Sequence, residues 1–527
     1  MYKFSIINLP TTQFIPAGEA TYAAAEELKL HRIFSARPML LGGRMVSPAL
    51  TFVCDYETIA HRLDMFDDLR RVPALCDLLE AVLPLLANLA ELTRTRDDVG
   101  KFAYIEYFMY VTKLNVYVQC VQKLYAGLTT LREKIKAAGF LHLYERVAAV
   151  HESAEFTHLV ENLAAFGADL LHIKSITVGI NLDGADLDEI GIVAVNTEPY
   201  RSGQLLDKIL RADFRSTAGD PFVCMTMLEP MFKGLNDVQK HEVNRSFKSA
   251  FDGALKKTLR GIQPKITAYM KEQGQFLVDI HSEVNFLVSG AAFIRELTEK
   301  RVPMTKPRLS TDNTAQLDGL VNLHLAQTLD AADIRPGDIH FDAQGMVYIL
   351  TGANSGGKSV FLFAVGLAQL LFQLGLYVPA RAAVMTPADH ICVHLSAKAA
   401  VQEGAGRLEQ ECMALNKLLP LATAKSLVLM DEPFASTGAY DGSVLAEEVL
   451  KQLARLGCKC IFSTHIHELT ARIAPINARA QTVGKLDSLV AVSNAGQRTY
   501  RIARHAPEGH SHAKDIAKKY GLVFDFD

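Results

Sequence analysis

The sequence lacks the features that mark secreted, membrane-spanning and disordered proteins. Its first residues, MYKFSIINLPTTQF, contain neither a positively charged start nor a long apolar run, so we expect no signal peptide. No stretch reaches the roughly 18 uninterrupted apolar residues that a membrane helix needs, and we expect no membrane partner. Hydrophobic residues make up 49% of the chain and charged residues 21%, which is the composition of a globular protein.

The chain also has few cysteines and a small net charge. Eight cysteines are scattered over 527 residues, which fits a reducing compartment better than a disulfide framework and predicts a cytoplasmic protein. The formal net charge is only −3, so any surface that binds nucleic acid has to be a local one. The length exceeds what one compact core holds and favours two to four domains.

The spacing of apolar residues divides the chain into sections. From about residue 21 to 168 they recur every three or four positions, which indicates helices. Over residues 173–196 they alternate around an Asp183–Gly184 turn signal, so we expect a hairpin or small sheet there. Helical spacing returns by Leu235 and continues to about Lys300. After the prolines of 302–307, strands and helices alternate, which is typical of an α/β domain.

A glycine-rich loop lies between an apolar strand over 347–351 and an apolar helix over 360–376. Its form is G-x-x-x-x-G-K-S, and in this context such a loop binds nucleotide phosphates through its backbone N–H groups. The lysine would neutralise the β- and γ-phosphates, and the serine hydroxyl would ligate Mg²⁺. ATP and Mg²⁺ are therefore the expected cofactors. The predicted nucleotide-binding residues are Gly352, Asn354, Gly356, Gly357, Lys358 and Ser359.

Two further strands end in polar residues. Residues 427–430 form an apolar strand that delivers Asp431 and Glu432 at its carboxyl end, where ligands bind in open α/β sheets. Asp431 would reach the magnesium through water, and Glu432 would act on the attacking water. The strand over 460–462 leads to His465. By itself this segment would indicate a surface histidine, but because it follows the other two motifs in this order we interpret His465 as a γ-phosphate contact. The predicted catalytic residues are therefore Lys358, Glu432 and His465.

These three segments resemble the ATPase of the MutS DNA mismatch-repair proteins, which are of the ABC class. TGANSGGKS, residues 351–359, is similar to their phosphate loop, with its Asn and double Gly at Asn354, Gly356 and Gly357. LVLMDEPFASTGAYDG, residues 427–442, and STHIHELT, residues 463–470, resemble the two segments that follow. Two upstream segments show weaker similarity: residues 56–69 resemble the start of the MutS core, and residues 267–309 resemble its returning lever helices. The resemblance implies a homodimer through the ATPase domains, with composite ATP sites and levers that embrace DNA.

Three departures from the family pattern stand out. Pro433 follows the acidic pair, where MutS proteins have an aliphatic residue. Gly406 stands where a serine would contact the neighbour's γ-phosphate, with Arg407 beside it as a substitute contact. Phe-x-Glu, the mismatch wedge of the family, occurs nowhere in the chain, and the core-like section begins within about 50 residues.

We therefore predict an α/β P-loop ABC-type ATPase domain preceded by a mainly α lever and core section with a small β-rich insertion. The predicted segments are a helical core and lever over 1–170, a β-containing insertion with a basic clamp-like segment over 171–266, returning lever helices over 267–308, and the ATPase domain over 309–527.

The DNA prediction depends on a basic stretch between residues 233 and 265. It carries three acidic residues, for a net charge of +5, and eight basic ones: Lys233, Lys240, Arg245, Lys248, Lys256, Lys257, Arg260 and Lys265. Such a stretch is either a phosphate-binding surface or a solvated helix face. Its position in the lever section favours an ATP-dependent DNA-binding protein, a dimeric clamp on branched or duplex DNA without mismatch recognition. The alternative is an ABC-type switch that engages a protein partner and binds no DNA.

Overall fold

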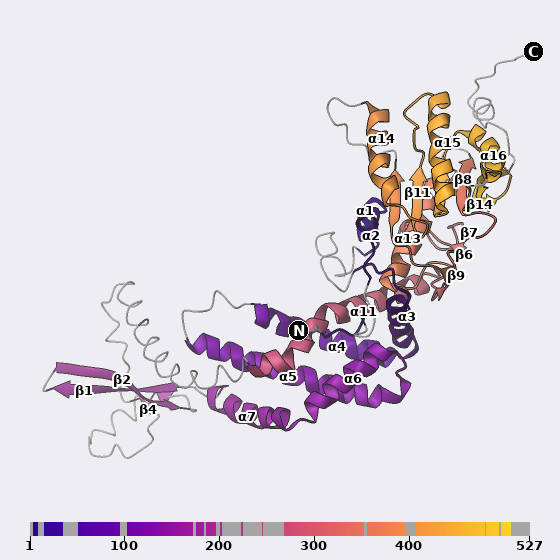
Figure 1. The fold of residues 1–527 in the computed structure, drawn as a ribbon. Helices are drawn as coiled ribbons and strands as arrows, with labels where there is room; N and C mark the ends of the chain where they lie inside the picture. The colour runs from indigo at the N-terminus through magenta and orange to yellow at the C-terminus, as the bar shows by residue number, and fades with distance from the viewer. Residues whose placement is uncertain are drawn as a thin grey trace, which may run out of the picture. The chain divides into compact units, whose positions relative to one another are not determined.

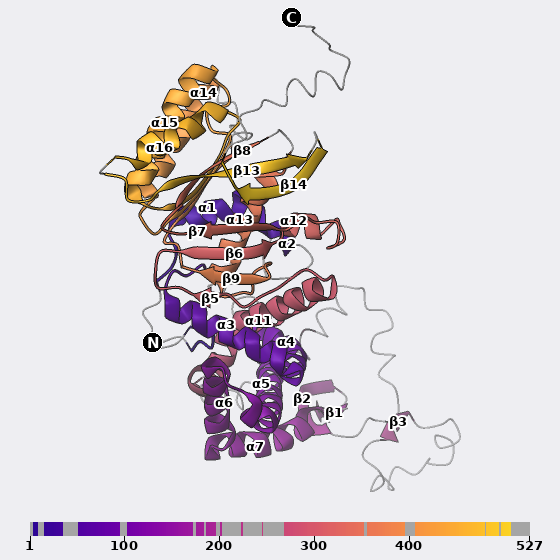
Figure 2. The same cartoon turned by 90° about the vertical axis from the view of Figure 1, so that its right-hand side faces the viewer.

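The computed structural model (Figures 1 and 2) describes residues 4–8, 15–34, 51–94, 103–171, 175–183, 186–196, 201–202, 223–224, 245, 268–352, 356–395, 406–479, 481–494 and 497–506. They belong to two compact units that interleave along the chain. Unit 1 comprises Met1–Phe4, Glu80–Arg132 and Leu143–His281, and unit 2 comprises Ser5–Leu79, Glu133–His142 and Ser282–Asp527. The four consecutive domains predicted from the sequence stay a prediction.

Unit 1 is mainly helical, as the apolar spacing predicted. Its elements are α5 (Ala103–Leu131), α7 (Ala154–Leu171), η3 (Met270–Gly274), the short strands β3 (Arg201–Ser202) and β4 (Val223–Cys224), and parts of α4 (Pro73–Arg94), α6 (Ala138–His151) and α11 (Gln275–Glu299). At its core the fully buried Tyr117 packs edge-on against Phe156 and Tyr269, with ring centroids 6.1 and 5.8 Å apart. Such aromatic pairs stabilise helix packing beyond the area they bury.

The predicted hairpin is confirmed. Strand β1 (Ser175–Asp183) pairs antiparallel with β2 (Asp186–Asn196), and Asp183 lies opposite Asp186. The basic stretch over 233–265 lies outside the described residues except for Arg245, which is exposed.

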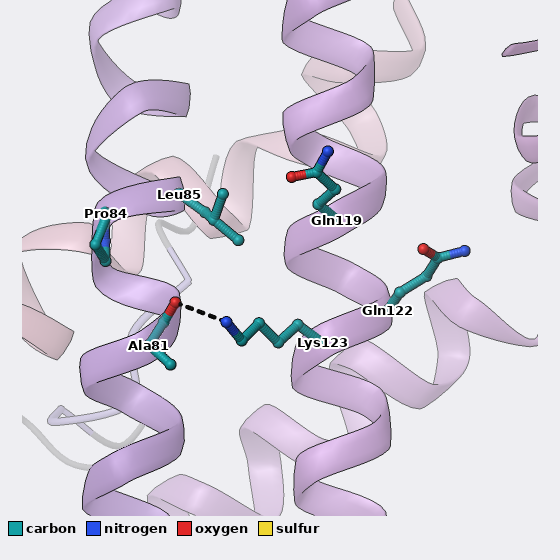
Figure 3. A pocket seen from close by; sticks show the side chains of 6 residues that line it. All are labelled: Ala81, Pro84, Leu85, Gln119, Gln122 and Lys123. Carbon is teal, nitrogen blue, oxygen red and sulfur yellow. Dashed lines mark hydrogen bonds between the residues drawn. The ribbon is translucent and has the colours of Figure 1, made fainter.

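A groove of about 540 Å³ separates α4 from α5 in unit 1 (Figure 3). Pro84 lies inside α4 and removes one backbone N–H from its hydrogen-bond ladder. At this groove the ammonium of Lys123, on α5, donates to the carbonyl oxygen of Ala81 at 3.1 Å. The lysine thus bridges the two helices at the position where the proline weakens α4.

Unit 2 is built on a six-stranded sheet with the strand order β10-β11-β12-β8-β13-β14. The pairings among the first five strands are parallel, and β14 runs antiparallel to β13. The strands are β8 (Val347–Gly352), β10 (Ile391–Leu395), β11 (Leu427–Asp431), β12 (Lys459–Ser463), β13 (Leu486–Asn494) and β14 (Gln497–Arg504). A smaller sheet has the order β5-β9-β6-β7, formed by β5 (Arg308–Leu309), β6 (Ala315–Leu320), β7 (Gly337–Phe341) and β9 (Ala382–Met385). The mixed α/β character predicted for this part of the chain is therefore confirmed.

Helices cover both faces of the six-stranded sheet, which explains why the central strands β8, β11 and β12 are mainly apolar and lack an alternation of apolar and polar residues. All six residues of β8 are buried. On one face lies α13 (Lys358–Leu374), and on the other α15 (Ala439–Leu456), whose Leu450 and Leu453 pack into the cluster formed by β8, β11 and β12. The other helical elements of unit 2 are α1 (Glu19–Glu27), α2 (Leu30–Ile33), α3 (Tyr56–Arg71), η2 (Arg132–Lys134, shared with unit 1), α12 (Leu323–Ala326), α14 (Arg407–Leu418), η5 (Leu419–Leu421), η6 (His467–Arg472) and α16 (Ile473–Asn477).

The first helices of the chain belong to this unit. Helix α1 packs against β10 and α13. Helical spacing alone shows that one face of such a helix is buried but not which element buries it.

The end of α13 meets a fully buried arginine. Arg62, on α3, donates to the carbonyl oxygens of Leu374 at 3.4 Å and Thr51 at 3.0 Å, and to the Asn8 side chain at 2.9 Å. Burial lowers the pKa of Arg62 to about 10. Gly375 ends the helix with φ +79°, and a Cβ there would lie 2.3 Å from that of Arg62. The guanidinium therefore caps the negative end of the α13 dipole.

One helical stretch among the described residues, Met270–Glu299, is long and apolar enough to cross a membrane. Within its most apolar window 56% of the residues are buried inside the protein. Buried core helices pass the same test, so this stretch adds no argument for a membrane partner.

Candidate nucleotide site

The predicted strand, loop and helix are present on both sides of residues 353–355, which lie outside the described part of the chain and include Asn354. Strand β8 ends at Gly352 with φ +129°, where a Cβ would lie 2.7 Å from that of Ala491 on β13. Helix α13 begins after Gly357, which has φ +97° and provides no side-chain cap. Both positions require glycine. The uncapped first turn leaves backbone N–H groups for an anion.

Lys358 is folded back over this loop. Its side chain is only 5% exposed, and its ammonium donates to the Gly352 carbonyl oxygen at 2.9 Å. The Glu432 carboxylate lies 3.6 Å from the same nitrogen. The lysine is thus held between a carbonyl oxygen and a carboxylate, and both are partners that a phosphate group could replace.

The acidic pair lies where the sequence predicted, at the carboxyl end of β11. Asp431 is in register with Ser463 of β12, and the Glu432 N–H donates to the Ser463 carbonyl oxygen at 2.9 Å. The Oδ1 atom of Asp431 and the Oγ atom of Ser463 are buried without a hydrogen-bond partner within the described part of the chain. Buried polar atoms are nearly always paired. These two therefore suit a bound ion or its water.

Glu432 adopts φ +51°, which is uncommon for a residue with a side chain. Backbone strain of this kind is concentrated at functional sites. The Thr464 N–H donates to the Leu350 carbonyl oxygen at 3.0 Å, so the end of β12 is held beside β8. His465 follows it and is exposed.

A cavity of about 550 Å³ opens beside these groups. Gly357, Lys358, Ser359 and Glu432 line one part of it, whereas Asp431 and His465 are not among its lining residues. The structure therefore brings four of the predicted residues to one cavity. The volume is within the usual range for a small-molecule site.

Another part of the cavity wall is apolar and was not predicted from the sequence. It is formed by Leu325, Leu329, Ile334, Tyr500 and Ile502. Tyr500 has φ +55°, is 53% exposed and lies against the loop, with its Cδ1 3.9 Å from where a Gly357 Cβ would be. A cavity wall that combines an aromatic ring with aliphatic side chains is suited to a flat purine base. No spacing rule would have linked these positions, since they come from different elements.

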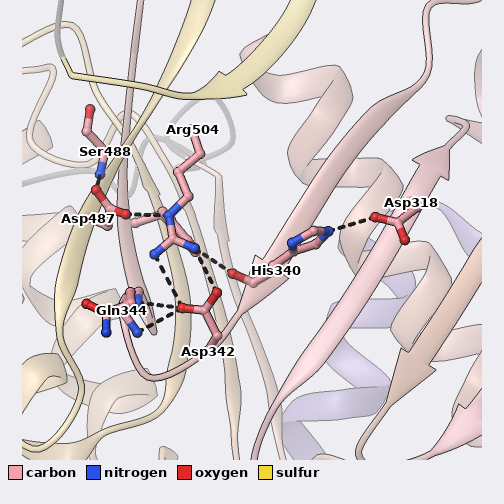
Figure 4. Close-up of polar contacts among 9 residues, drawn as sticks. Asp318, His340, Asp342, Gln344, Asp487, Ser488 and Arg504 are labelled. Carbon is pink, nitrogen blue, oxygen red and sulfur yellow. Dashed lines mark hydrogen bonds and ion pairs between the residues drawn. The ribbon is translucent and has the colours of Figure 1, made fainter.

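Tyr500 and Ile502 are on β14, and an ion-pair network holds that strand (Figure 4). Arg504, at its end, bonds to Asp342 at 2.8 Å and to Asp487 at 2.5 Å. Its guanidinium also lies over the Tyr348 ring, 5.5 Å from the centroid. The network ties β14 to β13 and to the turn before β8, which fixes this side of the cavity wall.

Gly406 and Arg407, which depart from the family pattern, lie at the start of α14. Gly406 is the N-cap of that helix, is exposed, and has no atom within 4 Å of where a Cβ would be. Arg407 is exposed as well, and Pro433 is buried after the acidic pair.

Comparison with known proteins supports the resemblance inferred from the motifs. The family model for MutS domain V matches residues 348–518. Proteins named DNA mismatch repair protein MutS are similar over the same region. The protein of Staphylococcus epidermidis is 32% identical over 201 residues, which is 38% of this chain and 22% of the relative. That of Staphylococcus saprophyticus is 30% identical over 210 residues, 40% of this chain and 23% of the relative.

The similarity covers about a fifth of the length of these relatives. The match to MutS domain V includes the loop, the acidic pair and His465 described above. The C-terminal region of this chain, residues 348–518, therefore matches MutS domain V and is similar to the corresponding part of MutS proteins.

Proposed function

We propose that this protein is a Mg²⁺-dependent ATPase that binds DNA. In this proposal ATP hydrolysis opens and closes a homodimeric clamp on branched or duplex DNA, and the clamp does not recognise mismatches. The observation that carries the ATPase proposal is the cavity in which Lys358, Ser359 and Glu432 face an apolar wall. Both the charge and the shape of that cavity suit a nucleoside triphosphate.

The residues present fit a bound magnesium ion. Ser359, which carries a hydroxyl group, lines the cavity, and the buried Asp431 Oδ1 is an acceptor without a partner among the described residues. Hydroxyl and carboxylate oxygens, directly or through water, are the ligands that Mg²⁺ prefers. When bound, the ion would neutralise charge on the β- and γ-phosphates. Ser359 and Asp431 are thus the proposed ligands.

The remaining roles follow from position and charge. Lys358 would leave the Gly352 carbonyl oxygen and the Glu432 carboxylate to bind the β- and γ-phosphates. That exchange frees Glu432 to accept a proton from the attacking water. Gly356 and Gly357 would offer backbone N–H groups, with Asn354 in the same loop. His465 is the proposed γ-phosphate contact.

The homodimer is proposed from the family resemblance, and Gly406 offers a test of it. Gly406→Ser should tighten the ATP-dependent dimer about 30-fold, because each of its two composite sites gains one hydrogen bond of about 1 kcal/mol to the neighbour's nucleotide. The N-cap has φ −66° and ψ 156°, so serine fits without strain. By itself the substitution should change the free energy of unfolding by only about a few tenths of a kcal/mol. Sedimentation with and without ATP measures the dimer.

Gly406→Ala is the matched control, since it adds the Cβ without the hydroxyl. Equal dimerisation of the serine and alanine variants would contradict a trans contact at this position.

The DNA-binding proposal rests on the basic stretch. Neutralising Lys256, Lys257 and Arg260 together should weaken DNA binding and reduce its salt dependence by up to about three counter-ion units, near 0.9 per phosphate contact. ATP hydrolysis without DNA should persist, since these residues lie outside the MutS domain V match. Binding measured over a series of salt concentrations gives the slope. An unchanged slope would leave this stretch a solvated face and favour the switch that engages a protein.

We also expect no preference for a mismatched pair. Mismatch sensing needs a wedge that enters the duplex and exploits easier bending at the damaged step, and Phe-x-Glu is absent from these 527 residues. Competition between a G·T duplex, its matched counterpart and a four-way junction at one salt concentration tests this. A tenfold preference for the mismatch, about 1.4 kcal/mol, would contradict it.

A further inference from the structure

The apolar wall of the cavity includes a helix too short to be stable by itself. Helix α12 has four residues, and isolated helices below about 12 residues are marginal in water. It nevertheless contributes Leu325 to the cavity wall, and Leu329, three residues after its end, also lines the cavity. Something outside α12 has to hold it in place.

On the side of the nucleotide cavity, Asn322 holds the start of α12. Its side-chain oxygen accepts from the N–H groups of His324 and Leu325 at 2.8 and 3.1 Å, which caps the helix. Its amide nitrogen donates to the carbonyl oxygen of Val360 at 2.6 Å, in the first turn of α13. Asn322 thus links the cavity wall to the helix that follows the phosphate loop.

On the other side α12 is tied to the first helices of the chain. The Nε2 atom of His324 bonds to the carbonyl oxygen of Leu28 at 2.9 Å, and the amide of Gln327 donates to the carbonyl oxygen of Arg32 at 2.8 Å. Because the partner of Nε2 is a carbonyl oxygen, this nitrogen must carry the proton. Burial first, and then the charges of Lys29, Arg32 and His31, lower the pKa of His324, whereas the bond to Leu28 raises it.

The helices that receive these bonds are firmly held. The N–H of Gly18 donates to the Asp389 carbonyl oxygen at 2.9 Å, and the N–H of Ile391 donates to the Thr21 hydroxyl at 3.1 Å. Leu28 is fully buried against α13, where a Cβ at Gly366 would lie 2.5 Å from its Cδ1. Residues 15–34 therefore form a fixed support behind α12.

We propose that His324 and Gln327 are positioning residues for nucleotide binding, which anchor α12 to residues 28–32 so that the base-facing wall is formed before ATP arrives. The inference rests on the ATP site proposed above. Neither residue is among those that line the cavity, so each acts through Leu325 and Leu329. A preformed wall lowers the cost of ordering the site on binding. Loss of the anchors should therefore raise the Kd and KM for ATP and leave kcat nearly unchanged.

The test measures MgATP binding by calorimetry, and steady-state hydrolysis, with the full chain. Gln327→Ala and His324→Leu should each raise the Kd for ATP about fivefold, the factor for one hydrogen bond of about 1 kcal/mol. His324→Gln retains a donor near the position of Nε2 and should stay within about twofold of the wild type. Gln327 is exposed, so its alanine variant is expected to fold even if His324→Leu does not.

His340→Leu is the matched control. His340 bonds to Asp318 at 2.7 Å (Figure 4), and neither residue is among those that line the cavity, so its loss should leave the Kd for ATP unchanged. If folded Gln327→Ala binds ATP as tightly as the wild type, or if kcat falls in step with affinity, the positioning role is wrong while the ATP site stands. If the wild type itself binds no ATP, the proposed function is wrong and the positioning role with it.

Discussion

Replacing Glu432 with Gln should slow ATP hydrolysis at least about a hundredfold while ATP binding is retained, because a positioned general base contributes at least that factor. Glutamine has nearly the same size but takes up no proton at neutral pH. It also weakens the ion pair with Lys358, whose ammonium lies 3.6 Å from the carboxylate. Affinity for ATP should therefore be equal to that of the wild type or higher. Phosphate release and equilibrium binding measure the two effects separately.

Glu448→Gln is the control for this variant. Glu448 is exposed on α15, where it pairs with Lys451 at 2.6 Å, and its neutralisation should change neither quantity. Since ATP would persist in the Glu432→Gln protein, light scattering should also reveal a larger species when ATP is added. Wild-type turnover by Glu432→Gln would remove this residue from the mechanism, and a monomer in ATP would contradict the composite site.

Lys358→Ala should abolish hydrolysis and weaken ATP binding about 10- to 100-fold. Hydrogen bonds to charged groups contribute about 1.5–3 kcal/mol, and a factor of ten corresponds to about 1.4 kcal/mol. Hydrolysis suffers more than binding because the lysine stabilises charge on the transferring phosphoryl group. Calorimetry gives the affinity, and phosphate release gives the rate.

The fold should survive this substitution. Lys358 is buried, but its partner Glu432 is 32% exposed and is solvated when the lysine is removed. Lys425→Ala, at an exposed lysine of the same unit, should leave binding and rate unchanged. Turnover by Lys358→Ala at the rate of Lys425→Ala would show that the loop does not act on phosphate.

Much of the phosphate end of the site was predictable because its determinants are local. The apolar run over 427–430 predicts a buried strand, and parallel pairing then brings its end beside that of β12, so the positions of Asp431 and Ser463 follow. The glycines at 352 and 357 have positive φ values, which glycine adopts without strain.

The apolar wall of the cavity was not predictable for the opposite reason. Leu325 and Tyr500 meet at one cavity although 175 positions separate their numbers in the chain. Tyr500 reaches it because β14 pairs with β13 and Arg504 holds that strand's end. Similarly, the bond between Thr21 and Ile391 spans 370 positions. Apolar spacing identifies a buried face but carries no information about such distant partners.

The position of Arg62 has a consequence for biosynthesis. Its acceptor at Leu374 is made 312 residues later, which at about 5–20 residues per second is a delay of roughly 15–60 s on the ribosome. During that interval α13 has not yet been made, so the apolar faces of α1 and α3 that later pack against it stay exposed. The nascent chain is then a substrate for chaperones. Conversely, a fragment that starts at residue 282 would begin without α1, α3 and Arg62, and the surface of α13 that they cover would be open to aggregation.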